Sequence, residues 1–214
     1  MSSIVIAGGH GKIALRLARL LSGDGHEVRA LIRNPAHGDD VREAGALPVE
    51  ADLEVAEDYR AWVRGADAVV FAAGAGAGSG PDRKRTVDLG AAVKLRDAAV
   101  AEGVTRYLMI SSMGAGDPSS ASEQMRRYQE AKHDADEAVM ASDLVWTIVR
   151  PGRLTDEAGA GTVEVAESLG RYGEVTRDDV AAVLAGCLGE PATERRVFEV
   201  LAGDTPIAQA LSQL

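Results

Sequence analysis

A tyrosine and a lysine stand four residues apart in the stretch YQEAK, as Tyr128 and Lys132. On a helix this spacing puts both side chains on one face. A lysine ammonium one turn away from a phenol favours the phenolate electrostatically, so the phenol can give or take a proton. The pair is therefore a candidate for general acid–base chemistry. A solvated tyrosine, with Lys132 in an ion pair with a nearby acid, is the competing interpretation.

Two serines, Ser111 and Ser112, end the apolar run RYLMISS and precede Tyr128 in the chain. A serine hydroxyl beside the tyrosine would hold the oxygen of a substrate. Ser112 is the first candidate for this role, and Ser111 is the alternative.

Three glycines, Gly8, Gly9 and Gly11, follow an apolar run and precede an amphipathic helical pattern. The spacing Gly9-x-Gly11-x-x-Ala14 is typical of dinucleotide-binding turns, in which the glycines bend the chain and let the backbone approach a pyrophosphate. The following helix N-terminus offers free N–H groups to an anion. A plain tight turn is the alternative, but the position at the first strand-to-helix junction favours a phosphate cradle.

The next two strand ends carry further candidate contacts. Arg33 ends the second run, ALIRNP, where NAD-selective sites carry an acid. Its guanidinium could pair with a 2′-phosphate, which favours NADP(H) over NAD(H); a surface arginine before a Pro turn is the alternative. Asp52 could accept a hydrogen bond from the adenine amino group. The small residues Ala72, Ala73 and Gly74 would let backbone pack against the nicotinamide-side ribose.

These residues need a scaffold, and the chain supplies a regular one. Short apolar runs alternate with longer stretches of helical period, which is typical of βαβ units and a parallel sheet with helices on both faces. Ligands in such sheets sit at the carboxyl ends of the strands, where these candidates fall. We expect strands near 4–7, 28–32, 46–49, 68–71, 107–110, 145–149 and 197–201. We expect helices near 12–21, 39–44, 56–64, 87–101, 123–141 and 177–188, and a terminal helix.

Several segments are expected to be loops. The Gly/Ala-rich segment Ala72–Gly80 would form a mobile loop after the fourth strand, and residues 153–167 read as a loop rich in glycine and acid. Residues 113–122 and 152–161 would line a modest substrate pocket.

Composition excludes several classes of protein. The chain has 214 residues and a formal net charge of -10, so it lacks the basic field that nucleic acids require. The one basic cluster, Arg83–Arg85, reads as surface. The single cysteine, Cys187, and the absence of ligand spacing among the histidines predict no metal site and a cytoplasmic, reducing compartment. No leader or membrane span is expected.

The chain resembles an atypical short-chain dehydrogenase/reductase, of the small NAD(P)H-binding group that is also similar to flavin and biliverdin reductases. The resemblance rests on GGHGKIA, RNP, ADL, FAAG, TVDLGAAVKLRDAA, GVTRYLMISSMGAG, YQEAK, TIVRPGRLTDEAGAG and TRDDVAAVL, in that order. It implies an α/β Rossmann-type, doubly wound parallel sheet in a single domain, 1–214. Residues 1–150 would form the cofactor core, and residues 151–214 would complete the substrate pocket.

The resemblance also implies roles for individual residues. Tyr128 would be the general acid, Lys132 the ribose-binding residue that tunes it, and Ser112 the oxyanion partner. Pyrophosphate neighbours would be Gly8, Gly11 and Lys12, with Arg33 reading the phosphate and Asp52 and Leu53 forming the adenine edge. The predicted cofactor contacts are completed by Gly9, His10, Ile13, Asn34, Ser111 and Pro151, and His10 replaces the Thr of many relatives.

Three functions remain open from the sequence. The first is an NADP(H)-dependent oxidoreductase that passes hydride to a small carbonyl, quinone or flavin-like acceptor. The second is a non-catalytic NADP-binding redox sensor or regulatory protein. The third is an NAD-dependent epimerase or dehydratase. In each case the ligand is a small molecule, and monomer and homodimer are both open.

Overall fold

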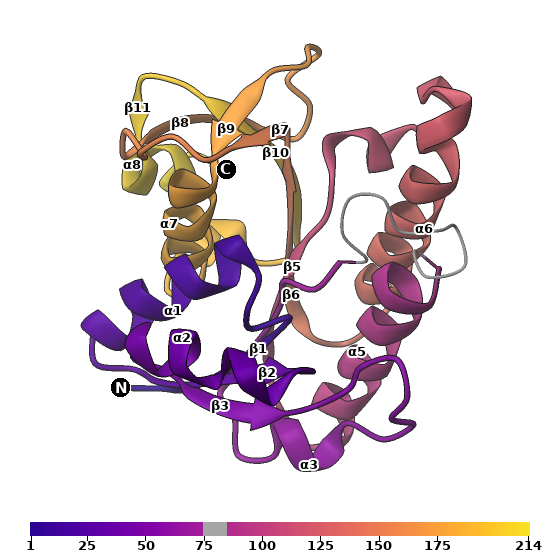
Figure 1. Cartoon of the computed structure of the whole chain (residues 1–214). Helices are drawn as coiled ribbons and strands as arrows, with labels where there is room; N and C mark the ends of the chain where they lie inside the picture. The colour runs from indigo at the N-terminus through magenta and orange to yellow at the C-terminus, as the bar shows by residue number, and fades with distance from the viewer. Residues whose placement is uncertain (75–84) are drawn as a thin grey trace.

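The computed structural model of the chain describes residues 1–74 and 85–214 (Figure 1). Within these residues, nine strands form one sheet in the order β11-β8-β10-β6-β5-β4-β1-β2-β3. Residues 75–84 lie outside the described part, and with them most of the loop expected at Ala72–Gly80 and of the basic cluster Arg83–Arg85. The predicted Rossmann-like α/β fold with a mostly parallel sheet is confirmed.

Most strands of the sheet run parallel, from β1 to β6 and including β10, whereas β8 pairs antiparallel with both β10 and β11. A separate parallel pair joins β7 and β9. The strands of the sheet are β1 Ser3–Ala7, β2 Glu27–Ile32, β3 Leu47–Glu50, β4 Ala68–Phe71, β5 Arg106–Ile110, β6 Val145–Pro151, β8 Thr162–Ala166, β10 Arg196–Ala202 and β11 Thr205–Pro206. The separate pair is β7 Arg153–Thr155 and β9 Glu174–Thr176.

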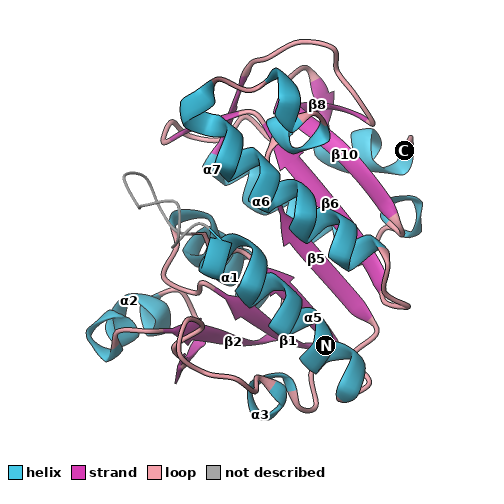
Figure 2. Ribbon diagram, turned by 90° about the vertical axis from the view of Figure 1, so that its right-hand side faces the viewer, coloured by secondary structure: helices cyan, strands magenta, loops and turns pink. Residues whose placement is uncertain are grey.

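Helices cover both faces of the sheet. One layer consists of α1 Lys12–Gly23, α2 Gly38–Glu43, α7 Arg177–Cys187 and α8 Ile207–Ser212. The other layer consists of α3 Arg60–Val63, the π-helical segment η2 Arg85–Ala91, α5 Ala92–Ala101 and α6 Glu123–Met140. Figure 2 shows α5 and α6 crossing the face of the sheet that is turned toward the viewer. Short 3-10 turns are η1 Pro35–His37, η3 Met113–Gly116, η4 Pro118–Ser120 and η5 Pro191–Thr193.

The first strand shows why the sheet forms. Ile4 and Ile6 pack into the core under α1 and α7, whereas Val5 and Ala7 pack into the core under α5 and α6. All four side chains are at most 1% exposed. Strands buried on both faces read as continuous apolar runs, and burying each large side chain stabilises the fold by about 2 kcal/mol. The carboxyl ends of the parallel strands consequently meet at one edge of the sheet.

Two expected elements differ from the structure. The helix expected at 56–64 is only Arg60–Val63, and the Asp58 carboxylate accepts a hydrogen bond from the Arg60 amide at 2.9 Å in a turn that precedes it. Tyr59 points inward and donates to the carbonyl oxygen of Leu53. The expected loop at 153–167 contains β7 and β8. Its TVEVA stretch alternates as a strand does and buries Val163 against the core.

Candidate active site

The glycine turn after β1 requires its glycines for close packing. Gly8 has φ +80°, and a Cβ there would lie 2.6 Å from the Cα of Ala73, at the exit of β4. A Cβ on Gly9 would lie 2.6 Å from that of Ala30, on β2. The Gly11 amide closes the turn by donating to the Gly8 carbonyl oxygen at 2.8 Å. The turn therefore packs closely between β2 and the exit of β4, where Ala30 and Ala73 leave room for it.

A cavity of about 430 Å³ opens at this turn and extends across the carboxyl ends of β1 to β4. Most of the predicted cofactor contacts line it: Gly8, His10, Gly11, Arg33, Asn34, Asp52, Leu53, Ala72, Ala73 and Gly74. Small residues of the turn and of the β4 exit line one part of it, and polar side chains that follow β2 and β3 line another. A dinucleotide needs such a close approach to backbone at a strand-to-helix turn, so these residues fit a bound NAD(P)H.

Several predicted contacts lie elsewhere. Gly9 packs on β2, Ile13 is 8% exposed in the core beneath α1, and Pro151 is buried at the end of β6. Lys12 reaches away from the turn to Asp156, with 2.5 Å between Lys12 Nζ and the carboxylate. This hydrogen bond holds the pKa of Asp156 below its usual range. The segment that follows β7 is thereby tied to the start of α1.

The polar end of the cavity contains interactions that the sequence does not reveal. Arg33 lies 2.8 Å from a Glu54 carboxylate oxygen, and its side chain is 55% exposed. His10 is 2.7 Å from Asp40, and its ring stacks on that of His37 with centroids 3.6 Å apart. The histidines are far apart in the sequence, and no spacing rule brings them together. Arg33 therefore lines the cavity just after β2, with the carboxylate of Glu54 beside it.

Ser111 and Ser112 leave β5 in opposite environments. Ser111 is 4% exposed and interacts with the carboxylate of Asp136 on α6. Ser112 is partly exposed, and its Oγ accepts a hydrogen bond from Gln129 Nε2 at 3.1 Å. A hydroxyl that accepts from a neighbour keeps its own proton available for donation. Ser112, the first candidate, is thus the more exposed of the two serines.

Lys132 is buried, whereas Tyr128 is partly exposed one turn earlier on α6. Lys132 Nζ lies 3.1 Å from Oδ1 of Asp88, on η2, and donates to the Ile110 carbonyl oxygen at 3.2 Å. Burial opposes its charge, but electrostatic interactions with Tyr128 and Asp88 raise the pKa of Lys132 above its ordinary value. The ion pair in the competing interpretation of YQEAK does exist, but it is buried beneath the tyrosine rather than solvated.

A second buried ion pair lies behind the first. Asp136 is fully buried, and its Oδ2 atom accepts a hydrogen bond from Arg150 Nε at 2.9 Å and forms an ion pair with Nη2 of the same guanidinium, also at 2.9 Å. Burial raises the pKa of Asp136, although the guanidinium opposes that shift. Lys132 and Asp136 are one turn apart on α6, so the ion pairs Asp88–Lys132 and Asp136–Arg150 are neighbours. The sequence analysis missed Asp88, Asp136, Arg150 and Gln129, because their partners lie on other elements.

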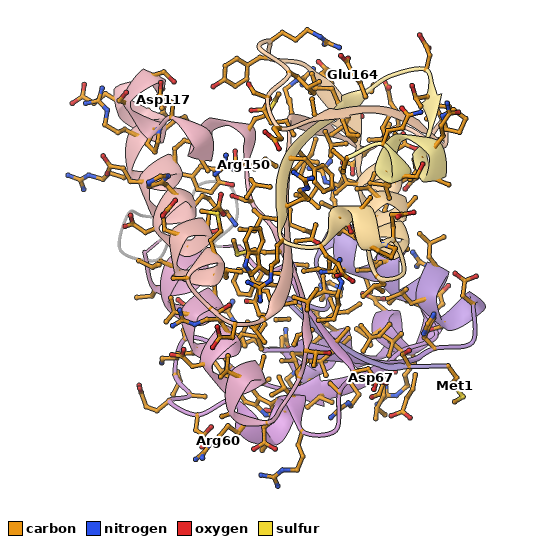
Figure 3. All side chains as sticks on the ribbon, turned by 180° about the vertical axis from the view of Figure 1, so that it is seen from behind. Met1, Arg60, Asp67, Asp117, Arg150 and Glu164 are labelled. Atoms are coloured by element: carbon orange, nitrogen blue, oxygen red, sulfur yellow. The ribbon has the colours of Figure 1, made fainter. Side chains whose placement is uncertain are left out.

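A second cavity, also of about 430 Å³, opens beside Ser112, at Met113 and Gly114. Residues from the expected segment 113–122 line it, but its far wall comes from 167–172 instead of 152–161. Arg150 also lines this cavity, and in Figure 3 it lies between the labelled residues Asp117 and Glu164. The cavity has the size of a small-molecule site.

Residues 8–191 match the NAD(P)H-binding family. Together with the glycine turn on a parallel sheet, this match defines a nucleotide-binding protein of the Rossmann-like class. The chain belongs to the NAD(P)H-binding family, and its structural neighbours include reductases of the atypical short-chain dehydrogenase/reductase type, as the sequence predicted.

Three similar proteins illustrate the range of the family. The chain is 40% identical over 213 residues to the "Uncharacterized sugar epimerase YhfK" of Bacillus subtilis, covering 99% of each chain. A solved structure from Bacillus halodurans, whose name proposes an NAD-dependent epimerase/dehydratase, has a TM-score of 0.96 at 40% identity, with full coverage of both chains. ChuY, an anaerobillin reductase of Escherichia coli O157:H7, has a TM-score of 0.81 at 25% identity and covers 95% of this chain and 98% of its own.

Among the described residues, no helix is long and apolar enough to cross a membrane.

Proposed function

We propose that the protein is an NADP(H)-dependent reductase that passes hydride to a small carbonyl, quinone or flavin-like acceptor. The observation that carries the proposal is the position of Tyr128 and Lys132. Both lie on α6, next to the carboxyl end of β5, on the same sheet edge as the glycine-turn cavity. Cofactor-binding and proton-transfer residues are thereby gathered at one edge, where a hydride transfer needs both.

Each residue has a distinct task in this proposal. A bound nicotinamide cofactor supplies the hydride. Ser112 donates a hydrogen bond to the acceptor oxygen while Gln129 holds Oγ in place. Tyr128 gives its phenolic proton to that oxygen as negative charge develops on the oxygen. The ammonium of Lys132 interacts electrostatically with the phenol. Gly8 and Gly11 bring backbone close to the diphosphate.

Cofactor choice rests on Arg33. Its partly exposed guanidinium is at the end of the cavity where a 2′-phosphate would bind, and this supports NADP(H) over NAD(H). Glu54 is 2.8 Å away, so the arginine has to exchange or share that partner when it binds a phosphate. The net preference is thus a balance between Arg33 and Glu54. The buried free thiol of Cys187 supports a cytoplasmic, reducing compartment.

The proposal is tested by following NADPH oxidation with a panel of carbonyl, quinone and flavin acceptors, using wild type and Tyr128→Phe. We expect turnover with at least one acceptor in wild type and a loss of about a hundredfold in the variant. NADPH affinity should be equal in both proteins. Equal turnover would remove Tyr128 from the mechanism, and NADPH binding without turnover would favour the non-catalytic sensor.

The second candidate is an NAD-dependent epimerase or dehydratase. It is supported by the names of the 40% identical proteins from the two Bacillus species. Such an enzyme returns its hydride to the substrate and keeps its cofactor. Nucleotide extracted from the protein after gel filtration decides between the candidates: retained NAD supports the epimerase, and a protein that exchanges NADPH freely supports the reductase.

A further inference from the structure

Asp88 and Lys132 form the most enclosed ion pair beside the candidate site. Asp88 is 1% exposed, and its Oδ1 atom is 3.1 Å from Lys132 Nζ. The same nitrogen donates to the Ile110 carbonyl oxygen at 3.2 Å. The ion pair with Asp88 and the hydrogen bond to Ile110 thus attract the ammonium from two elements at once. The pair therefore holds the lysine in one orientation beneath Tyr128.

The position of Asp88 is set by the wide turn of η2 and by the exit of β4. A Cβ on Gly74 would lie 3.3 Å from Asp88 Oδ1, and Gly74 lines the glycine-turn cavity. Single π-helical turns often occur at functional sites, because they displace one side chain from the regular helix face. Asp88 accordingly lies between the cofactor cavity and α6.

The charged groups around Tyr128 differ in burial, and on α6 itself the exposed ones are Glu123, Arg126, Arg127, Glu130, Asp134 and Glu137. The described elements packed against α6 are η2, η3, η4, α5 and β6. From these, η2 brings Asp88 and β6 brings Arg150, which is bound to Asp136 of α6 itself. The segments η3 and η4 contain no titratable side chain.

The charged groups at the edges of α6 have partners of their own, away from the Asp88–Lys132 pair. On α5, Lys94 pairs with Glu57 and Arg96 pairs with Asp97. Asp117, which follows η3, accepts hydrogen bonds from Ser119, and His133 on α6 contacts the Ala115 carbonyl oxygen. Asp88 is consequently the acid that directly faces the Lys132 ammonium from the adjoining element.

We propose that Asp88 is a positioning residue that keeps Tyr128 a proton donor by offsetting the charge of Lys132. The proposal rests on the proposed function, in which Tyr128 gives its proton to the reduced product. An unopposed ammonium beside a phenol favours the phenolate, which suits proton removal and oxidation. A carboxylate 3.1 Å from that ammonium cancels much of this effect. The phenol then keeps its proton until an acceptor oxygen becomes basic enough to take it. The site is thereby adapted to reduction.

The test measures Tyr128 ionisation directly and needs no substrate. Tyrosinate absorbance is followed during an alkaline titration, and the Tyr128→Phe curve is subtracted in each background, which isolates Tyr128 from the other tyrosines. We expect Asp88→Asn to lower the Tyr128 midpoint by about one pH unit, because the ammonium is no longer offset. Asp134→Asn is the matched control. It removes the same charge from an exposed position on α6 and should leave the midpoint unchanged.

A second variant protects the test against misfolding. Asp88→Glu retains the carboxylate and should keep the wild-type midpoint, so a shift seen only in Asp88→Asn follows charge rather than packing. An unchanged or raised midpoint in folded Asp88→Asn would overturn the proposal. Loss of the Tyr128 requirement in the turnover assay would overturn the proposed function instead, and the titration still decides whether Asp88 controls Tyr128 ionisation.

Discussion

The glycine-turn cavity and the Tyr128 region are built in different ways, although they share one edge of the sheet. The cavity begins at the glycine turn, where Gly8 and Gly9 let the chain pack closely against β4 and β2. The region around Tyr128 depends on buried charges from separate elements, through the pairs Asp88–Lys132 and Asp136–Arg150. The turn can therefore be encoded within a few consecutive residues. The electrostatics of proton transfer require partners that only the complete fold assembles.

The largest expected effect comes from the buried charges. Asp136→Ala removes the fully buried partner of Arg150 and should lower the free energy of unfolding by about 4 kcal/mol, because the guanidinium stays behind unpaired. The exposed pair Asp39–Arg42, with 2.8 Å between its atoms, provides the control. Asp39→Ala should cost less than about 0.5 kcal/mol. Urea unfolding measures both, and similar losses in the two variants would contradict the contrast between the regions.

The glycine turn should be the next most sensitive position. Gly8→Ala forces a Cβ to within 2.6 Å of Ala73 and imposes a left-handed conformation on a residue that disfavours it. The free energy of unfolding should fall by about 3 kcal/mol. Gly65→Ala is the matched control, because Gly65 has φ +70° with no atom within 4 Å of its Cβ position. It should cost about 1 kcal/mol, which isolates the conformational part. Equal costs would mean that the close approach to β4 is unimportant.

The same difference explains what the sequence predicts and what it does not. Strands β1 to β6 and β10, helices α1 and α6, and the glycine turn follow from local patterns, since apolar runs and glycine spacing act over a few residues. Ser112, which follows β5, and Tyr128 on α6 are also predicted from local sequence, and their catalytic roles stay predictions. Asp88 and Arg150 were not, because an acid in TVDLG and an arginine before a proline become important only when η2 and β6 pack against α6.

Arg33 illustrates a partial success. Its position at the end of β2 was predicted, and it does line the cavity. Its neighbour Glu54 lies on the segment after β3, and the pairing of β2 with β3 brings the two together. Sequence spacing thus gives the location of a side chain at a strand end, while its local charge balance depends on the neighbouring strand.

Alkaline conditions test the buried phenol of Tyr59, which donates to the Leu53 carbonyl oxygen. Burial raises the pKa of Tyr59 from 10.0 to about 12. The unfolded chain therefore ionises first as the pH rises, so this contribution to stability is complete below pH 10 and is lost between about pH 10 and 12. Relative to neutral pH, wild type should lose about 1.4 kcal/mol more than Tyr59→Phe near pH 11. Urea midpoints against pH measure this, with the exposed Tyr172→Phe as control; identical curves for all three proteins would contradict it.

The central claim is that NADP(H) binds along the glycine-turn cavity with its 2′-phosphate at Arg33. The most direct test is to titrate wild type, Arg33→Ala and Arg42→Ala with NADPH and with NADH, and to follow binding by fluorescence. We predict that wild type prefers NADPH and that Arg33→Ala weakens NADPH about tenfold while NADH is unaffected, since one charge-assisted contact is lost. Arg42→Ala, which alters an exposed arginine on α2, should bind both nucleotides like wild type. An unchanged NADPH affinity in Arg33→Ala would contradict the account and would mean that the phosphate is recognised elsewhere.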